Sequence, residues 1–134
     1  MSRRKLREHL FKLVFLYAFN PEAEIEEQAD LYLDGISGIT DAEREYLKDR
    51  LKAVRGHVGE IDEMLNNTAR GWKTSRFNSC DLAVLRVAVY EMRFDDSIPD
   101  GVAINEAVGL AKLYGGDESP SFINGILGEL SRKE

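Results

Sequence analysis

The sequence has one cysteine, three prolines and two histidines among its 134 residues. A lone cysteine, Cys80, cannot close an internal disulfide, so we expect a reducing compartment. The histidines lie far apart, and His57 has no second ligand at metal spacing, which argues against a metal site. No apolar run approaches the roughly 18 residues that span a membrane, and charges interrupt the basic N-terminus too early for a secretory signal. These absences predict a cytoplasmic protein.

Signatures of catalysis are missing as well. Gly115 and Gly116 stand alone, without the repeated glycines of a phosphate-binding loop. The order of the residues suggests no Ser/His/Asp or Cys/His set, and the many carboxylates lie on helical faces without a pocket signal. We therefore expect a protein that binds its partners and is not an enzyme.

Apolar residues recur at helical spacing along the chain, and no segment alternates as a strand does. The chain is the size of one domain, residues 1–134, and can bury roughly 68% of its unfolded surface. The segment after Asn78 is apolar nearly all round, which is typical of a buried core helix. The prediction is an all-α fold of about seven helices, over residues 6–17, 22–35, 40–56, 57–70, 78–92, 99–114 and 119–130.

Polar motifs indicate where three of these helices begin. Thr40 and Glu43 have the spacing of a capping box, in which each side chain bonds the other residue's backbone N–H. Asn78 repeats that spacing, with an aspartate in the place of the glutamate. Ser119 is expected to be the N-cap of the last helix, with the following proline as its first residue.

Two charges, Arg86 and Glu91, interrupt the apolar helix. Buried charges must be paired, so we expect a structural network in which Arg86 bonds Glu91 or Glu106. Cys80, near the start of the same helix, is interpreted as a small packing residue.

The charge is unevenly distributed. The formal net charge is −6, which on average argues against a nucleic-acid binder. Residues 21–34, however, contain six acids and no base, whereas residues 1–12 contain five bases and one acid, and the local field decides where a polyanion docks. We call these five bases the basic tip: Arg3, Arg4, Lys5, Arg7 and Lys12. Alternatively, they are merely solvated bases, although cations at a helix N-terminus are unfavourable and their presence there suggests a use.

An ordered set of motifs spans residues 72–127: Trp72, Arg76, Phe77, residues 81–91 (DLAVLRVAVYE), Pro99, residues 102–108 (VAINEAV), Ala111, Lys112, Tyr114, Gly115 and residues 122–127 (FINGIL). Upstream, a basic first-helix motif comprises Arg3, Arg4, Arg7, Glu8, Leu13 and Phe15. With these motifs in this order, the sequence resembles the NusB family of bacterial transcription antitermination factors. The resemblance covers essentially the whole chain, weakly between residues 22 and 67.

The resemblance implies an all-helical fold of two packed three-helix bundles. It also implies binding of the boxA element of ribosomal RNA operon transcripts, together with NusE, a small-subunit ribosomal protein. This happens within an antitermination complex on RNA polymerase, without catalysis and without a cofactor. The same domain occurs appended to rRNA cytosine methyltransferases, but this chain has no room for a methyltransferase, so the free-standing factor is expected.

The RNA surface that the resemblance implies lies on the first and last helices, at Arg3, Arg4, Arg7, Phe15, Glu118, Ser121 and Phe122. The family often has a lysine at the place of Ser121, so one phosphate contact is in question. Phe122 is interpreted either as a stacking partner for an unpaired base or as a core residue. For the protein partner the resemblance points to Asp81 on an outer face, whose competing interpretation is a cap.

Two functions remain open from the sequence alone. One is an RNA-binding subunit that works with NusE. The other is a helical protein-interaction adaptor without RNA binding, which the net charge of −6 and the acidic residues 21–34 favour. A homodimer that buries the basic tip is a further possibility.

Overall fold

Seven α-helices and one short 3-10 helix form the described part of the chain, residues 1–69 and 77–133 of a computed structural model. Trp72 and Arg76, which contributed to the family resemblance, lie outside the described residues. The elements are α1 (Arg3–Tyr17), η1 (Glu22–Glu24), α2 (Ile25–Asp34), α3 (Asp41–Gly56), α4 (Val58–Thr68), α5 (Ser79–Phe94), α6 (Asp100–Tyr114) and α7 (Ser119–Arg132). The described residues contain no strand, and the predicted all-α fold is confirmed. None of the helices described is both long and apolar enough to cross a bilayer.

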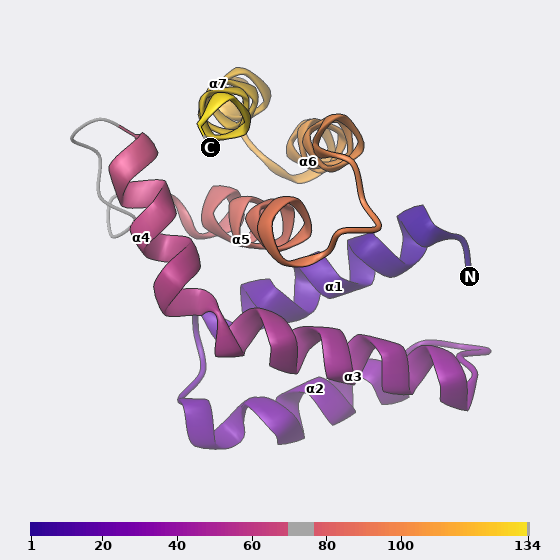
Figure 1. Cartoon of the computed structure of the whole chain (residues 1–134). Coiled ribbons are helices and arrows are strands. Elements are labelled where there is room, and N and C mark those ends of the chain that lie inside the picture. Colours follow the sequence, from indigo (N-terminus) through magenta and orange to yellow (C-terminus); the bar gives the residue numbers. More distant parts are fainter. Residues whose placement is uncertain (70–76, 134) are drawn as a thin grey trace.

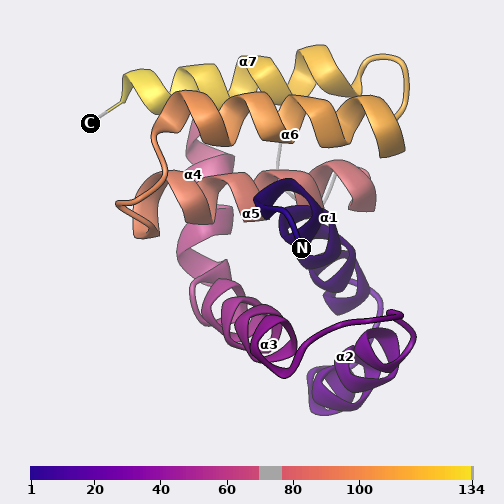
Figure 2. The ribbon, with the colours of Figure 1, turned by 90° about the vertical axis from the view of Figure 1, so that its right-hand side faces the viewer.

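The helices form two groups that meet along α1 and α5. Helices α1, α2 and α3 lie in the lower half of Figure 1, and α5, α6 and α7 lie above them. In the second view α6 and α7 run side by side over α5 (Figure 2). Helix α1 packs on both α3 and α5, while α4 follows α3 and packs against α5 and α7. This is the pair of three-helix groups that the resemblance implies, with α4 as the seventh helix joining them.

Helix α5 is the centre of the core, as its composition predicts. Its Leu85 and Val89 are completely buried, and α1 contributes Leu13 and Val14 with about 1% of their surface exposed. Because α5 packs against α1, α6, α7, α4 and α3, a polar side chain on nearly any of its faces must find a partner inside the protein.

The predicted capping motifs are present. The Thr40 hydroxyl accepts from the Glu43 backbone N–H at 3.1 Å, and the Glu43 carboxylate accepts from the Thr40 N–H at 3.0 Å. At α5, the Asn78 side-chain oxygen accepts from the Asp81 N–H at 2.8 Å. The return bond differs, because the Asp81 carboxylate accepts from the Asn78 side-chain amide and not from its backbone.

The start of α7 differs by one residue from its prediction. Glu118 is the N-cap and Ser119 already lies in the helix, so the prediction of Ser119 as N-cap is wrong. The Ser119 hydroxyl instead accepts from the Gly116 N–H at 3.0 Å and closes the α6–α7 turn. A Cβ atom on Gly115 would lie 2.6 Å from the Ser119 side chain, so only glycine fits there.

The partner of Arg86 was also predicted wrongly. Arg86 donates two hydrogen bonds to the Asp62 carboxylate of α4, at 2.8 and 3.0 Å. Glu91 follows five residues later on α5, which places it about 140° around the helix. It therefore faces a different neighbour, and the two charges belong to separate ion pairs.

Replacing Leu85 by alanine should lower the free energy of unfolding by about 2–5 kcal/mol, because the side chain is completely buried and its loss leaves a cavity. The matched change Leu113→Ala removes a leucine that is 70% exposed and should have little effect. Urea denaturation of both variants measures the difference. Equal losses would show that α5 is not the centre of the core.

Candidate nucleic-acid interface

The three arginines expected to meet RNA have different surroundings at the start of α1. Arg3 is exposed and has no ion pair or hydrogen bond with any described residue. Arg4 is also exposed, yet its guanidinium donates to both oxygens of Glu106 on α6, at 3.1 and 3.2 Å. The Arg7 side chain is only 11% exposed. Arg3 and Arg4 are therefore accessible to a ligand, whereas Arg7 is largely enclosed.

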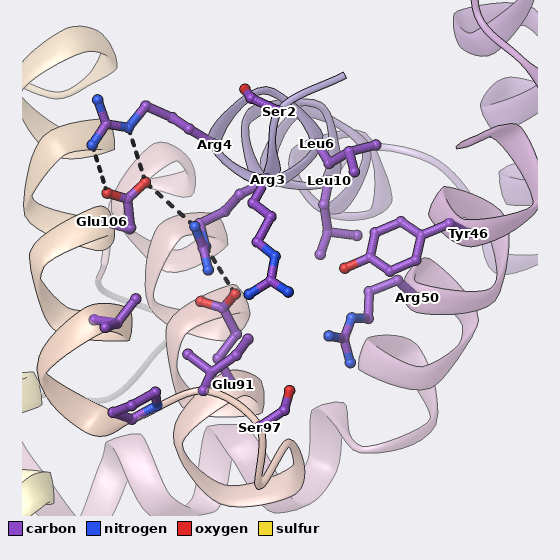
Figure 3. Close-up of a pocket in the computed structure, with 14 residues that line it drawn as sticks. Ser2, Arg3, Arg4, Leu6, Leu10, Tyr46, Arg50, Glu91, Ser97 and Glu106 are labelled. Carbon is purple, nitrogen blue, oxygen red and sulfur yellow. Dashed lines mark hydrogen bonds and ion pairs between the residues drawn. The ribbon is translucent and has the colours of Figure 1, made fainter. Parts of the chain in front are cut away.

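Arg7 lies between two glutamates from different helices. Its Nε donates to Glu91 of α5 at 2.8 Å, and its Nη1 donates to Glu106 of α6 at 3.3 Å. Figure 3 labels the two glutamates, and dashed lines there mark these bonds. Burial raises the pKa of Glu91, and the positive charge of Arg7 opposes that rise. We call these three residues together with Arg4 the arginine–glutamate network. It joins α1, α5 and α6. Glu91 and Glu106 were expected as partners of Arg86, but in the structure both bond Arg7.

An aromatic strip continues from the basic tip along α1. The Phe15 ring lies 4.9 Å from that of Phe19 and 6.4 Å from that of Phe11, and Phe11 lies 5.2 Å from Tyr114 of α6. We define the strip as Phe11, Phe15, Phe19 and Tyr114. Phe19 is 61% exposed and Tyr114 is 40% exposed, so part of the strip is open to solvent.

Polar groups border this strip. The Lys12 ammonium lies 5.3 Å from the centre of the Tyr114 ring, within cation–π range. The Tyr114 hydroxyl donates to Glu8 at 2.8 Å, and Lys5 donates to the other oxygen of Glu8, also at 2.8 Å. These two bonds lower the pKa of Glu8. Sequence reasoning gave no role to Tyr114 or Phe19. The contact of Tyr114 with Phe11 joins α6 to α1 and cannot be derived from spacing, so the motif at Tyr114 was its only signal. Phe19 follows Phe15 by four residues, and this local spacing could have indicated their contact.

The α6–α7 turn brings together two sets of residues that had been assigned to different ligands. Phe122 and Glu118, expected at RNA, and Asp81, expected at the protein partner, line one hollow of about 690 Å³. Phe122 is half-buried and meets Phe77 edge to face at 5.3 Å. The interpretation of Phe122 as a core residue holds in part, since its ring packs on the core. The ring also lines an open hollow, and its role as a stacking partner stays a prediction. Ser121 is exposed on the first turn of α7 and does not line the hollow.

Asp81 does not lie on an outer face, and that expectation is wrong. Only 5% of it is exposed, because α5 turns this residue toward the α6–α7 turn. One carboxylate oxygen accepts from Asn78, and the other, Oδ1, is buried without a hydrogen-bond partner among residues 1–69 and 77–133. Within this part of the chain, the hollow is where Asp81 can meet a ligand.

The remaining reactive side chains have structural surroundings. His57 stacks on Phe94 with ring centres 4.0 Å apart, and its Nδ1 lies 3.0 Å from Glu60. Cys80 contacts the Tyr114 carbonyl at 3.4 Å, and burial raises the pKa of its thiol, which makes it a weaker nucleophile at neutral pH. Within residues 1–69 and 77–133, no three His, Cys, Asp or Glu side chains are grouped as a metal site requires.

Comparison with known proteins identifies relatives over almost the whole chain. The sequence model of the NusB family matches residues 4–132. Transcription antitermination protein NusB of Lachnoclostridium phytofermentans is 48% identical over 97% of this chain and 98% of its own length. The protein of the same name from Agathobacter rectalis is 44% identical, over 98% of this chain and all of its own.

Solved structures show the same fold. NusB of T. maritima superposes with a TM-score of 0.89 at 28% identity, covering 99% of this chain and 92% of that one. A chain from a complex of antitermination factors NusB and NusE with double-stranded RNA has a TM-score of 0.78 at 23% identity, covering 98% of each chain.

Replacing Arg7 by methionine should destabilise the protein by about 3–5 kcal/mol, because it leaves the buried Glu91 carboxylate without its counter-charge. The pKa of Glu91 should then rise further. When the pKa of a carboxyl group is higher in the folded state than in the unfolded state, the free energy of unfolding falls as the pH rises from the unfolded pKa to the folded pKa. The penalty should therefore be largest at neutral pH and smaller below about pH 4, as urea denaturation at the two pH values would measure.

Arg4→Met is the matched control. It removes a guanidinium that bonds the same Glu106, but the Arg4 side chain is 82% exposed, so little stability should be lost. Equal losses for the two variants, or a penalty for Arg7→Met that does not change with pH, would contradict the structural role of Arg7.

Proposed function

The chain belongs to the NusB family, and on this premise we propose that it is a transcription antitermination factor that binds boxA RNA of ribosomal RNA operon transcripts together with NusE. It does so within the antitermination complex on RNA polymerase, by binding and without a catalytic step. The names of its relatives and the solved complex of NusB and NusE with RNA support this function. The match to residues 4–132 supports one NusB-like domain over residues 1–134, working in the cytoplasm.

The observation that carries the proposal is the surface at the start of α1. On a chain of net charge −6, Arg3 and Arg4 project from one helix end, and the aromatic strip begins about two turns further along α1, at Phe11, where Lys12 lies over the Tyr114 ring. Exposed cations bind phosphates in any sequence, while exposed rings stack on unpaired bases. Phe15 in the strip, and Phe122 with Glu118 and Ser121 at the α6–α7 turn, extend this surface.

Arg7 has a different part in this surface. Its guanidinium already bonds two carboxylates, so a phosphate would have to compete with both. We assign Arg7 to holding α1 against α5 and α6, and the phosphate contacts to the exposed arginines. The partner NusE is assigned to the Asp81 side of the hollow, beside the RNA surface at Phe122 and Glu118. The Asp81 Oδ1, which has no hydrogen-bond partner among the described residues, would accept a donor from this partner.

Removing both exposed arginines, with Arg3→Gln and Arg4→Gln, should weaken binding of boxA RNA in the presence of NusE. Each phosphate contact on single-stranded RNA contributes about 0.7 to the slope of log K against log salt concentration. The slope should therefore become shallower by about 1.4. Fluorescence anisotropy titrations at several salt concentrations give both values.

The control variant carries Lys52→Gln and Arg132→Gln, which remove the same charge from α3 and from the end of α7. It should keep the wild-type slope. If both double variants weaken binding equally, the contact is a diffuse charge effect and the assignment to α1 fails. If the wild-type protein captures NusE but prefers boxA RNA no more than scrambled RNA, the chain is a protein adaptor and the proposed function is wrong.

A further inference from the structure

A second hollow lies beneath the basic tip, between the start of α1, helix α3 and the α5–α6 connection (Figure 3). Its volume is about 780 Å³, within the usual range of ligand pockets. Part of its wall is apolar and consists of Leu6, Leu10, Ile98 and Val102. The charged part consists of Arg3, Arg4, Arg7, Arg50, Glu91 and Glu106. We call it the α1 pocket.

Glu91 gives the α1 pocket an unsatisfied acceptor. Only 5% of this residue is exposed, and its Oε2 accepts from Arg7 at 2.8 Å. The other oxygen, Oε1, is buried and has no hydrogen-bond partner in the described part of the chain. A buried acceptor without a donor is unfavourable, so a ligand that brings an N–H group to this oxygen is favoured.

Arg3 gives the same pocket an unsatisfied donor. The other lining arginines have carboxylate partners: Arg4 bonds Glu106, Arg7 bonds both glutamates, and Arg50 bonds Asp95. Arg3 has no such partner among the described residues. Figure 3 shows its side chain reaching into the pocket between Glu91 and Arg50. The pocket thus offers an acceptor and a donor beside an apolar wall.

Three kinds of group can be compared with this arrangement. A phosphate in the pocket would be repelled by the Glu91 carboxylate. A lysine or arginine of a protein partner would be repelled by four guanidinium groups. An unpaired nucleobase carries N–H donors and ring or carbonyl acceptors on its edges, and its flat faces suit an apolar wall. Its phosphates would lie outside, near Arg3 and Arg4.

We propose that the α1 pocket receives one unpaired base of the bound RNA, with a base N–H donating to Glu91 Oε1 and Arg3 donating to an acceptor of the same base. A guanidinium has five N–H donors, so Arg3 keeps its contact with the adjoining phosphate. The inference rests on the proposed function, because it needs RNA at the start of α1. It adds recognition of a single base to a surface otherwise assigned to phosphate contacts and stacking.

The test uses boxA RNA with a single abasic site moved through the sequence, titrated into the protein with NusE. Wild-type protein should lose about tenfold to a hundredfold in affinity at one position, as expected for one buried base. Val102→Phe fills the pocket from a side chain that is 48% exposed. It should bind intact RNA more weakly and be insensitive to the abasic site at that position.

Two controls make the result specific. Leu113→Phe adds the same ring to the same helix outside the α1 pocket, and it should keep the wild-type response to the abasic site. Arg3→Gln should reduce that response, whereas Lys5→Gln, which removes an equal charge from the same helix end outside the pocket, should keep it. The arginine variant also tests the inference if Val102→Phe does not fold, which a circular dichroism melt would reveal.

The inference is overturned if Val102→Phe or Arg3→Gln responds to every abasic site as the wild-type protein does. It is also overturned if no single position matters in the wild type while intact boxA RNA still binds, and the proposed function then stands without it. If wild-type protein with NusE does not bind boxA RNA at all, the proposed function itself fails.

Discussion

The buried Glu91 carboxylate is the constraint on which the rest of this structure depends. It lies on the core helix α5, 5% exposed, and needs a positive charge that must come from another helix. Arg7 supplies it from α1 and bonds Glu106 of α6 at the same time. The two helical groups are therefore joined by a charge interaction as well as by apolar packing, and the direction of α1 relative to α5 and α6 is fixed.

Because of this constraint, the arginines of the basic tip have two different roles. The enclosed Arg7 stabilises the contact between helices, while Arg3 and Arg4, one turn earlier, remain open to solvent. Because Arg4 shares Glu106 with Arg7, the carboxylate that positions the enclosed guanidinium also orients the exposed one. A surface that must meet a polyanion is thus held rigid by acids of its own protein, which lowers the entropy lost on binding.

The sequence predicted most of the fold because its signals are local. Helical spacing, the capping motif at Thr40 and the apolar run of α5 each depend on residues within a few turns of one another. The site was predicted less well, because its contacts join distant segments. Nothing in the spacing indicates that Arg86 meets Asp62, or that Asp81 turns inward beside Phe122. Those contacts depend on how helices pack, which the family resemblance implied only as an overall fold.

Gly115 has a consequence that extends beyond its own turn. Since a side chain there would overlap Ser119 and the Ala111 carbonyl, the turn between α6 and α7 can be this tight only with glycine at that position. Phe122 lies one turn into α7, so a glycine seven residues earlier determines where its ring stands. If RNA stacks on Phe122 as proposed, the ring offers it a fixed surface, and the nucleic acid has to adapt its conformation on binding.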